Sequence, residues 1–298
     1  MTEPAIRTEG LTKDYGDVLA LDQLDLVVEA GEIVGFLGPN GAGKSTTIRL
    51  LFDLIRPTSG RAAIFGHDCQ ADSVAARKQA GYLAGDLRLY ENLTARETFR
   101  YVARLRNEPV DDEYAAELAR RFELNIDRPV RALSKGNRQK VGIILALMAR
   151  PPLLVLDEPA SGLDPLVQHS LWQVLREEAD RGAAVFFSSH VMSEVEAVCH
   201  RVAILRQGRL AAFEPIDKLR GRSMRHMRVT FADGAHAEDF GAIEGVSVVS
   251  RNGSTVNLEV RSNINAVVQA LARHTIVDLE SEPPSLDEII LSYYEQPK

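Results

Sequence analysis

Residues 33–50 read IVGFLGPNGAGKSTTIRL, an apolar run, a glycine-rich loop and then a second apolar pattern. The apolar run predicts a buried strand over Ile33–Leu37, and the spacing of Ile48, Leu50 and Leu51 predicts a helix after the loop. The motif GxxxxGKS between a strand and a helix is the phosphate-binding P-loop. A glycine-rich turn with a chance lysine would not carry the whole pattern in this setting.

Each residue type in the loop answers a need of a nucleoside triphosphate, which carries several negative charges in a small volume. Gly38, Gly41 and Gly43 let the backbone curl so that N–H groups face the phosphates, and the following helix adds its N-terminal dipole. Lys44 supplies an ammonium for the β- and γ-phosphates, and the Ser45 hydroxyl is a ligand for Mg²⁺. The predicted nucleotide-binding residues are Gly38, Pro39, Asn40, Gly41, Ala42, Gly43, Lys44, Ser45 and Thr46.

The composition favours a soluble protein with more than one domain. The chain has 298 residues, a net charge of −7 and no basic stripe, so we expect no nucleic-acid partner. Cys69 and Cys199 are isolated and lack metal-ligand spacing, which predicts free thiols of a cytosolic protein. The N-terminus lacks the apolar core of a signal peptide, and the longest uncharged apolar run, residues 141–149, is too short to cross a bilayer. Any membrane role would then require a partner.

The regions on both sides of the P-loop predict an α/β core with a helical insert. Residues 5–29 alternate like strands and predict an antiparallel layer ahead of the P-loop. Helices are predicted over residues 73–80, 94–106 and 111–122, and Thr94 with Glu97 forms a capping box. We expect residues 86–140 to be a largely helical insert. Tyr15 lies in a turn, where loop packing is a better explanation for a lone tyrosine than stacking on a base.

Two acidic residues follow a second buried strand, predicted over residues 153–156. Asp157 and Glu158 stand at the tip of that strand, where two carboxylates are costly unless they have partners. In a P-loop protein Mg²⁺ is the natural partner for Asp157, and Glu158 can polarise the attacking water. Helix capping by both acids is the alternative explanation.

Two other element ends carry candidate site residues. Ser134 is a good N-cap for a helix, and Gly136 leaves N–H groups accessible, so this helix end could hold an anion. Taken alone, an ordinary capped helix is the better explanation for these two residues. A third buried strand, over residues 183–187, ends in Ser188-Ser189-His190, where α/β sheets place ligands. Taken alone, a histidine there is more often structural.

Past Pro215 the character of the sequence changes. Residues 218–228 are basic and predict a linker, residues 246–260 predict a hairpin around Asn252-Gly253, and residues 264–274 predict a helix. A capping box of Ser285 and Glu288 predicts a terminal helix. We therefore predict two domains, residues 1–215 and residues 216–298. The second is a small α+β domain without a catalytic cluster, suited to interaction or dimer support.

The ordered set GPNGAGKST, LSKGN, LLVLDEP, SGLD and SSH resembles the nucleotide-binding subunit of ABC transporters over residues 3–215. More loosely, the tail SLDEIILSYYE is similar to the C-terminal region of the daunorubicin-type exporter ATPases. The resemblance implies a P-loop NTPase fold of the ABC type and an ATPase that uses ATP and Mg²⁺. It also implies export of a small drug-like or lipid-like molecule through a separate multi-spanning permease. The subunit would lie on the cytoplasmic side of the cell membrane, peripheral through that permease.

The resemblance also implies a role for each motif. Tyr15 stacks on adenine, Asp157 holds the metal through water, Glu158 is the general base, and His190 contacts the γ-phosphate. Two cassettes of this family face head to tail around ATP, so a homodimer with two competent sites is expected. The residues that act across this interface, three of them on the γ-phosphate of the opposite subunit, are Ser134, Gly136, Asn137 and Asp164.

Two departures from the family pattern stand out. The family signature usually reads LSGGQ, whereas Lys135 replaces the first glycine and Asn137 replaces the glutamine here. Asparagine keeps a side-chain amide, and the lysine adds positive charge near a phosphate. Many members carry a glutamine about where Gly85 falls, and the neighbouring Asp86 could compensate for it. One alternative is a soluble ABC ATPase in translation or DNA repair, but such proteins typically have two cassettes or long coiled-coil insertions. The other is a P-loop kinase, which would leave the SGLD and signature motifs unexplained.

Overall fold

The apolar run before the P-loop forms a central strand of a six-stranded sheet. In the computed structural model, which describes residues 3–106, 112–221, 225–234 and 236–282, the order is β10-β9-β3-β8-β7-β6, with only β10 antiparallel to its neighbour. Strands β3, β7 and β8 are buried along their whole length, which explains their unbroken apolar runs. The strands are β3 (Ile33–Leu37), β6 (Ala80–Leu83), β7 (Leu153–Asp157), β8 (Ala184–Ser189), β9 (Arg201–Arg206) and β10 (Arg209–Pro215).

A second sheet confirms the predicted antiparallel layer. Its order is β2-β1-β4-β5, and every pair in it is antiparallel. Along β2, Leu21, Leu24, Leu26 and Val28 are buried while Gln23 and Asp25 are exposed, as expected for a sheet with one covered face. The strands are β1 (Ile6–Asp14), β2 (Leu19–Val28), β4 (Ser59–Ile64) and β5 (His67–Asp68).

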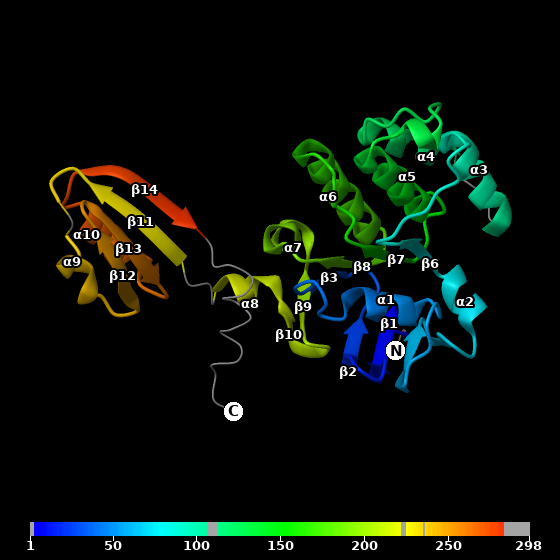
Figure 1. Ribbon diagram of the computed structural model, residues 1–298, viewed down its shortest axis with the longest axis horizontal. Coiled ribbons are helices and arrows are strands. Elements are labelled where there is room, and N and C mark those ends of the chain that lie inside the picture. Colours follow the sequence, from blue (N-terminus) through cyan, green and yellow to red (C-terminus); the bar gives the residue numbers. More distant parts are fainter. Residues whose placement is uncertain (1–2, 107–111, 222–224, 235, 283–298) are drawn as a thin grey trace. The chain divides into compact units, whose positions relative to one another are not determined.

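The P-loop helix α1 (Lys44–Leu51) lies between the two sheets, since it contacts β2 and β4 as well as β7. Its Ile48 belongs to one apolar core with Leu24 of the antiparallel layer and Phe186 of β8. In Figure 1, α1 and the antiparallel strands lie on one side of the six-stranded sheet. On the other side lie α5 (Lys135–Leu147), α6 (Pro165–Asp180) and α7 (Met192–Val198).

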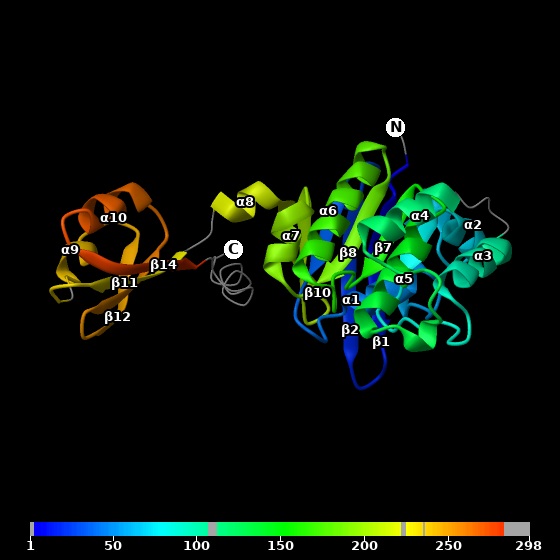
Figure 2. The same ribbon diagram turned by 90° about the horizontal axis from the view of Figure 1, so that it is seen from above.

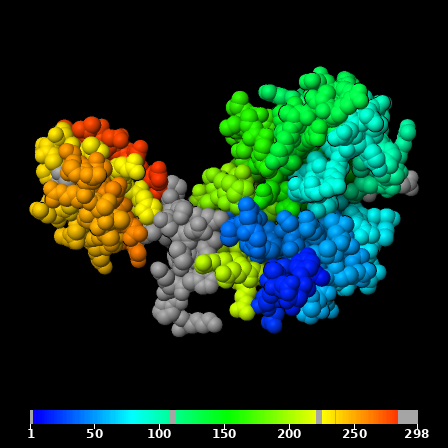
Figure 3. Space-filling model, viewed as in Figure 1, coloured from blue at the N-terminus to red at the C-terminus, as the bar shows by residue number. Residues whose placement is uncertain are grey.

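The segment after β6 is helical, as predicted. It contains α3 (Ala95–Arg106), α4 (Asp112–Arg121) and the 3₁₀ turn η1 (Val130–Ala132). Figure 2 shows α3 and α4 beside α5, and Figure 3 shows the surface of this lobe in cyan and green, apart from the blue strands. The capping box is confirmed: Thr94 N donates to Glu97 Oε2 at 2.8 Å, and Glu97 N donates to Thr94 Oγ1 at 3.2 Å. The helix predicted over residues 73–80 is too long, because α2 (Ser73–Lys78) ends before Ala80 begins β6.

The chain divides into two compact units, Met1–Pro215 and Ile216–Lys298. In the second unit one antiparallel sheet, in the order β12-β13-β11-β14, buries one face under α9 and α10. The predicted hairpin is present, but its turn is formed by Gly253 and Ser254, one residue later than predicted, because Asn252 still pairs with Thr255. The elements are α8 (Ile216–Gly221), β11 (Arg225–Phe231), α9 (Glu238–Gly241), β12 (Val246–Asn252), β13 (Thr255–Val260), α10 (Ile264–Leu271) and β14 (Ile276–Glu282).

The prediction of a linker over residues 218–228 is wrong. Helix α8 and the first half of β11 occupy most of it, because Met227 is buried on the covered face while Arg225 and Arg228 are exposed. Arg225 lies at the strand end on the same face as Met227, and Arg228 lies on the opposite face, so both arginines take exposed positions of a strand. The helix predicted from Ser285 lies outside the described residues. Within the described ranges no helix is both long and apolar enough to cross a membrane, and Cys69 and Cys199 are buried, free thiols.

Candidate nucleotide-binding site

The loop between β3 and α1 has the backbone shape that its glycines predict. Gly41 and Gly43 adopt left-handed φ angles of 81° and 109°. A Cβ atom on Gly43 would also lie 2.5 Å from the Ala20 carbonyl oxygen, so a side chain there would collide with β2. Lys44, 5% exposed, begins α1 and donates from Nζ to the Gly38 and Pro39 carbonyl oxygens at 2.7 and 3.2 Å. The Lys44 side chain therefore folds back over the loop and is held by the loop's own carbonyl groups.

A cavity of about 480 Å³ lies beside this loop. Tyr15 and Val18, from the turn between β1 and β2, line it together with the loop, and Glu158 reaches it from the end of β7. Tyr15 is 53% exposed, and Lys13 Nζ lies over its ring, 4.9 Å from the centroid, so a flat ligand would use the opposite face. The loop residues that line the cavity are Asn40, Gly41, Gly43, Lys44, Ser45 and Thr46.

The carboxylate of Asp157 lies next to this cavity, at the end of β7, and is 5% exposed. Ser188 Oγ donates to Asp157 Oδ1 at 2.5 Å and accepts from Glu158 N at 2.9 Å, so one hydroxyl orients both acidic residues. Asp157 and Ser45 line a second cavity of about 340 Å³. A Cβ atom on Gly85 would lie 2.8 Å from Asp157 Oδ2, so the space beside this oxygen depends on the glycine.

Asp86 also lines the second cavity, but its carboxylate is paired with Arg88 at 3.3 Å and is 74% exposed. A role for Asp86 in place of the missing glutamine therefore stays a prediction.

Glu158 is held in an unusual backbone conformation at the mouth of the site. Its φ angle is 49°, which is rare for a residue with a side chain and occurs where surrounding contacts compensate the strain. Its Oε1 lies 3.1 Å from His190 Nδ1 and 3.9 Å from Lys44 Nζ. Burial lowers the pKa of Lys44, and the nearby charges of Glu158 and Asp157 oppose this shift. The structure thus brings Lys44, Asp157, Glu158 and His190 to one place.

The loop that carries His190 is held by contacts that the sequence analysis missed. Ser189 Oγ donates to Glu194 Oε2 at 2.6 Å and accepts from Val191 N at 2.9 Å. Burial raises the pKa of the Glu194 carboxyl, which the Ser189 hydrogen bond partly counteracts. The available signal was two serines that end an otherwise apolar strand, where fully buried hydroxyls require specific partners.

The motif at residues 133–137 lies at the N-terminus of α5. Ser134 caps this helix and accepts from Asn137 N at 3.2 Å. Gln139, another residue that was missed, donates from Nε2 to the Glu158 and Pro159 carbonyl oxygens at 3.1 and 3.2 Å, which ties α5 to the segment after β7.

None of Ser134, Gly136 and Asn137 is among the described residues that line the P-loop cavity of their own chain. Asp164 likewise caps α6, accepting from Val167 N at 3.0 Å, and this hydrogen bond lowers its pKa.

Known proteins resemble both units of this chain. The family model described as ABC transporter matches residues 21–161. The chain is 34% identical to the daunorubicin/doxorubicin resistance ATP-binding protein DrrA of Streptomyces peucetius, over 98% of this chain and 93% of that protein. It is 36% identical to the probable multidrug ABC transporter ATP-binding protein YbhF of Escherichia coli (strain K12), where the match covers 74% of this chain and spans 39% of the relative's length.

Solved structures agree with these relatives. An ATP binding subunit of an ABC transporter has a TM-score of 0.67 at 34% identity and covers 72% of this chain and 92% of its own. The dimeric bacterial ABC transporter cassette MJ0796 has a TM-score of 0.65 at 26% identity, over 71% and 98%. The comparisons support the predicted ABC fold and the transporter interpretation, not the alternative role in translation or DNA repair. The chain belongs to the family of ABC transporter ATP-binding subunits, which are ATPases.

Proposed function

We propose that this chain hydrolyses ATP to power the export of a small drug-like or lipid-like compound through a separate membrane permease. The observation that carries the proposal is the convergence of Lys44, Asp157, Glu158 and His190 beside a P-loop cavity. Export is supported by the similarity to DrrA, a daunorubicin/doxorubicin resistance protein that matches nearly the whole chain. A kinase is not favoured, because it would leave the signature motif at residues 133–137 and the SGLD motif at residues 161–164 unexplained.

Binding begins at the P-loop. The N–H groups of the loop and the α1 dipole attract the phosphates, and the Lys44 ammonium adds a full charge beside them. Tyr15 offers its exposed face to the adenine ring, since it lines the same cavity as the loop. In this arrangement the base and the phosphates would share one cavity.

The residues present fit a Mg²⁺ ion. The donors are oxygens, a buried carboxylate of Asp157 and the Ser45 hydroxyl, and they line one cavity. Ser188 occupies only Oδ1 of Asp157, and the absence of a side chain at Gly85 leaves room beside Oδ2. Ser45, and Asp157 through water, would hold the ion. When bound, the ion neutralises charge on the phosphate oxygens.

Hydrolysis needs a base that takes a proton from water, and Glu158 is our assignment. Glu158 Oε1 accepts the proton as the water oxygen attacks the γ-phosphorus. The bond from that phosphorus to the bridging oxygen breaks, and its electron pair stays on ADP. His190, hydrogen-bonded to the same carboxylate, orients it and contacts the γ-phosphate. Lys44 stabilises the charge that develops on the transferred group.

The α5 terminus supports a dimer. The N-terminus of α5 could bind an anion, and its residues Ser134, Gly136 and Asn137 do not line the P-loop cavity of their own chain. We therefore assign them to the nucleotide that a second copy of the chain binds. Asp164, at the start of α6, would work across the same interface. We therefore propose a homodimer with two nucleotides between the copies, in line with the dimeric cassette that this chain resembles.

The two units receive different roles. Residues 1–215 form the nucleotide-binding domain and residues 216–298 an accessory domain that supports the dimer or the partner. The subunit would lie at the cytoplasmic face of the membrane, held by a multi-spanning permease, without nucleic acid. Truncation after Pro215 tests the first point: ATP binding should persist while assembly weakens. Loss of ATP binding by a folded truncated chain would contradict the division.

Recovery of the chain from detergent-solubilised membranes tests the partner. We expect a multi-spanning protein to co-purify with it and to raise its ATPase rate. The chain with Glu158→Gln should keep this partner, because the substitution leaves the fold intact. Recovery with a translation or repair complex and no membrane protein would overturn the transporter assignment.

A further inference from the structure

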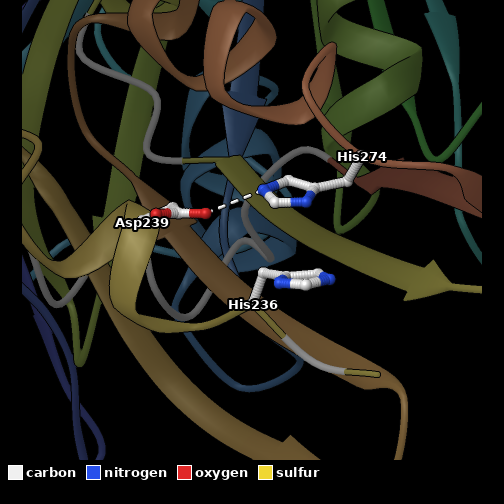
Figure 4. Close-up of side chains that lie close together, drawn as sticks. All are labelled: His236, Asp239 and His274. Carbon is white, nitrogen blue, oxygen red and sulfur yellow. Dashed lines mark hydrogen bonds and ion pairs between the residues drawn. The ribbon is translucent and has the colours of Figure 1, made fainter. Parts of the chain in front are cut away.

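Two imidazoles and a carboxylate meet in the second unit, far along the chain from any nucleotide motif (Figure 4). His236 precedes α9, Asp239 lies within α9, and His274 follows α10. One potential ligand atom from each residue lies within 4.8 Å of the others. His274 Nε2 is 2.7 Å from Asp239 Oδ2, the contact that Figure 4 marks with a dashed line. Two segments that are far apart in the sequence, residues 236–239 and the residue that follows α10 at position 274, therefore meet at one point.

The two rings are held in place by their packing. They are stacked, with centroids 3.9 Å apart and planes 15° from parallel. Phe231, 2% exposed in the sheet beneath, meets both rings edge-on at centroid distances of 5.4 and 5.6 Å. These contacts keep the three side chains together, but the nitrogen lone pairs of stacked, nearly parallel rings do not point at one position, so binding of an ion requires one ring to turn.

A second carboxylate orients one of the rings. Asp233 Oδ1 lies 3.3 Å from His236 Nε2, which leaves Nδ1 of that ring as the potential ligand atom. A carboxylate that binds the far nitrogen of a metal-binding histidine is the usual second layer of such sites, where it orients the ring and increases its basicity. The side chains of His236 and His274 are 32% and 14% exposed, so an ion can enter from solvent.

We propose that His236, Asp239 and His274 form a binding site for a divalent cation of the Zn²⁺ class. Two imidazole nitrogens and one carboxylate oxygen are a donor set that zinc prefers, whereas Mg²⁺ and Ca²⁺ prefer oxygens alone. Three protein ligands leave one position for water or an outside ligand. The bound ion ties the segment before α9 to the end of α10 and so stabilises the second unit, independently of nucleotide hydrolysis.

Calorimetric titration of the tag-free full chain with zinc chloride, with excess Mg²⁺ present, tests the proposal. We expect one equivalent of zinc to bind with a rise in melting temperature. His236→Gln and His274→Gln should each weaken the affinity by at least about tenfold. The matched control is His169→Gln, which removes an exposed histidine of α6 and should bind zinc like the natural chain.

Two further variants keep the test decisive if a histidine substitution disturbs folding. Asp239→Asn removes the ligand charge and nearly preserves side-chain size, and Asp233→Asn changes a residue that is 62% exposed. Asp239→Asn should abolish the visible absorption bands of a bound Co²⁺ probe, and Asp233→Asn should weaken zinc binding about tenfold. Absence of stoichiometric zinc binding to the natural chain, or unchanged affinity in both folded Asp variants, would overturn the proposal.

Discussion

Replacing Glu158 by glutamine separates binding from chemistry at the nucleotide site. The glutamine amide has the size of the Glu158 carboxylate, and the hydrogen bond from the backbone N–H of residue 158 to Ser188 Oγ is unchanged. The strained φ of 49° should therefore persist. What disappears is the oxygen that lies 3.1 Å from His190 Nδ1 and that we assign as the proton acceptor. The charge near Lys44 Nζ, 3.9 Å away, disappears as well, so the ammonium keeps more of its attraction for phosphate.

The expected effect on turnover follows from the role of a general base. Such a group contributes about 10²–10⁴-fold to a rate, which corresponds to about 3–5 kcal/mol of activation free energy. We expect the kcat of ATP hydrolysis to fall within this range while the affinity for ATP stays equal or rises, and the ATP-bound dimer should accumulate. Phosphate release measures the first quantity and sedimentation velocity the last.

A matched control is Glu117→Gln, which changes an exposed acid of α4 and should leave kcat unchanged. If Glu158→Gln hydrolysed ATP within about threefold of the natural rate, a loss far below that expected for a general base, the assignment of the base would be wrong. A normal rate in the variant would also remove the main reason for placing His190 at the γ-phosphate.

Three other substitutions probe the site and its support. Tyr15→Ala should raise the KM for ATP by the equivalent of ~1–3 kcal/mol, the usual loss of one base–aromatic stack, and Tyr15→Trp should restore it; equal KM values would refute the stacking. Glu194→Gln keeps an acceptor for Ser189. Because burial raises the pKa of this carboxyl, its stabilising contribution is present at low pH and is lost as the pH rises through the folded-state pKa. The melting temperature of the variant should therefore exceed that of the natural chain more at about pH 7.5 than at about pH 4. Tyr114→Phe removes the hydroxyl that donates to the buried Glu178 at 2.6 Å, and the free energy of unfolding in urea should fall by about 1.5–3 kcal/mol; no loss would show that α4 and α6 do not depend on this bond.

The parts of the fold that were predicted correctly depend on neighbours in sequence. The capping box at Thr94 joins residues three positions apart, and the turn after Asn252 joins adjacent strands, so local geometry specifies both. The linker prediction failed because a basic composition does not reveal which face of a strand is covered. Strand β14 was missed because its residues are mostly exposed and it gains its place only by pairing with β11.

The same division holds at the two sites. The sequence by itself determined that a P-loop, two acids at a strand tip and a capped helix are present, because glycine conformation, buried charge and capping are properties of short segments. Only the tertiary structure decided that Ser188 orients Asp157 from the neighbouring strand and that His236 stacks on His274. Those contacts join positions far apart in the chain, and strand order and packing in three dimensions, which no local pattern specifies, bring them within bonding distance.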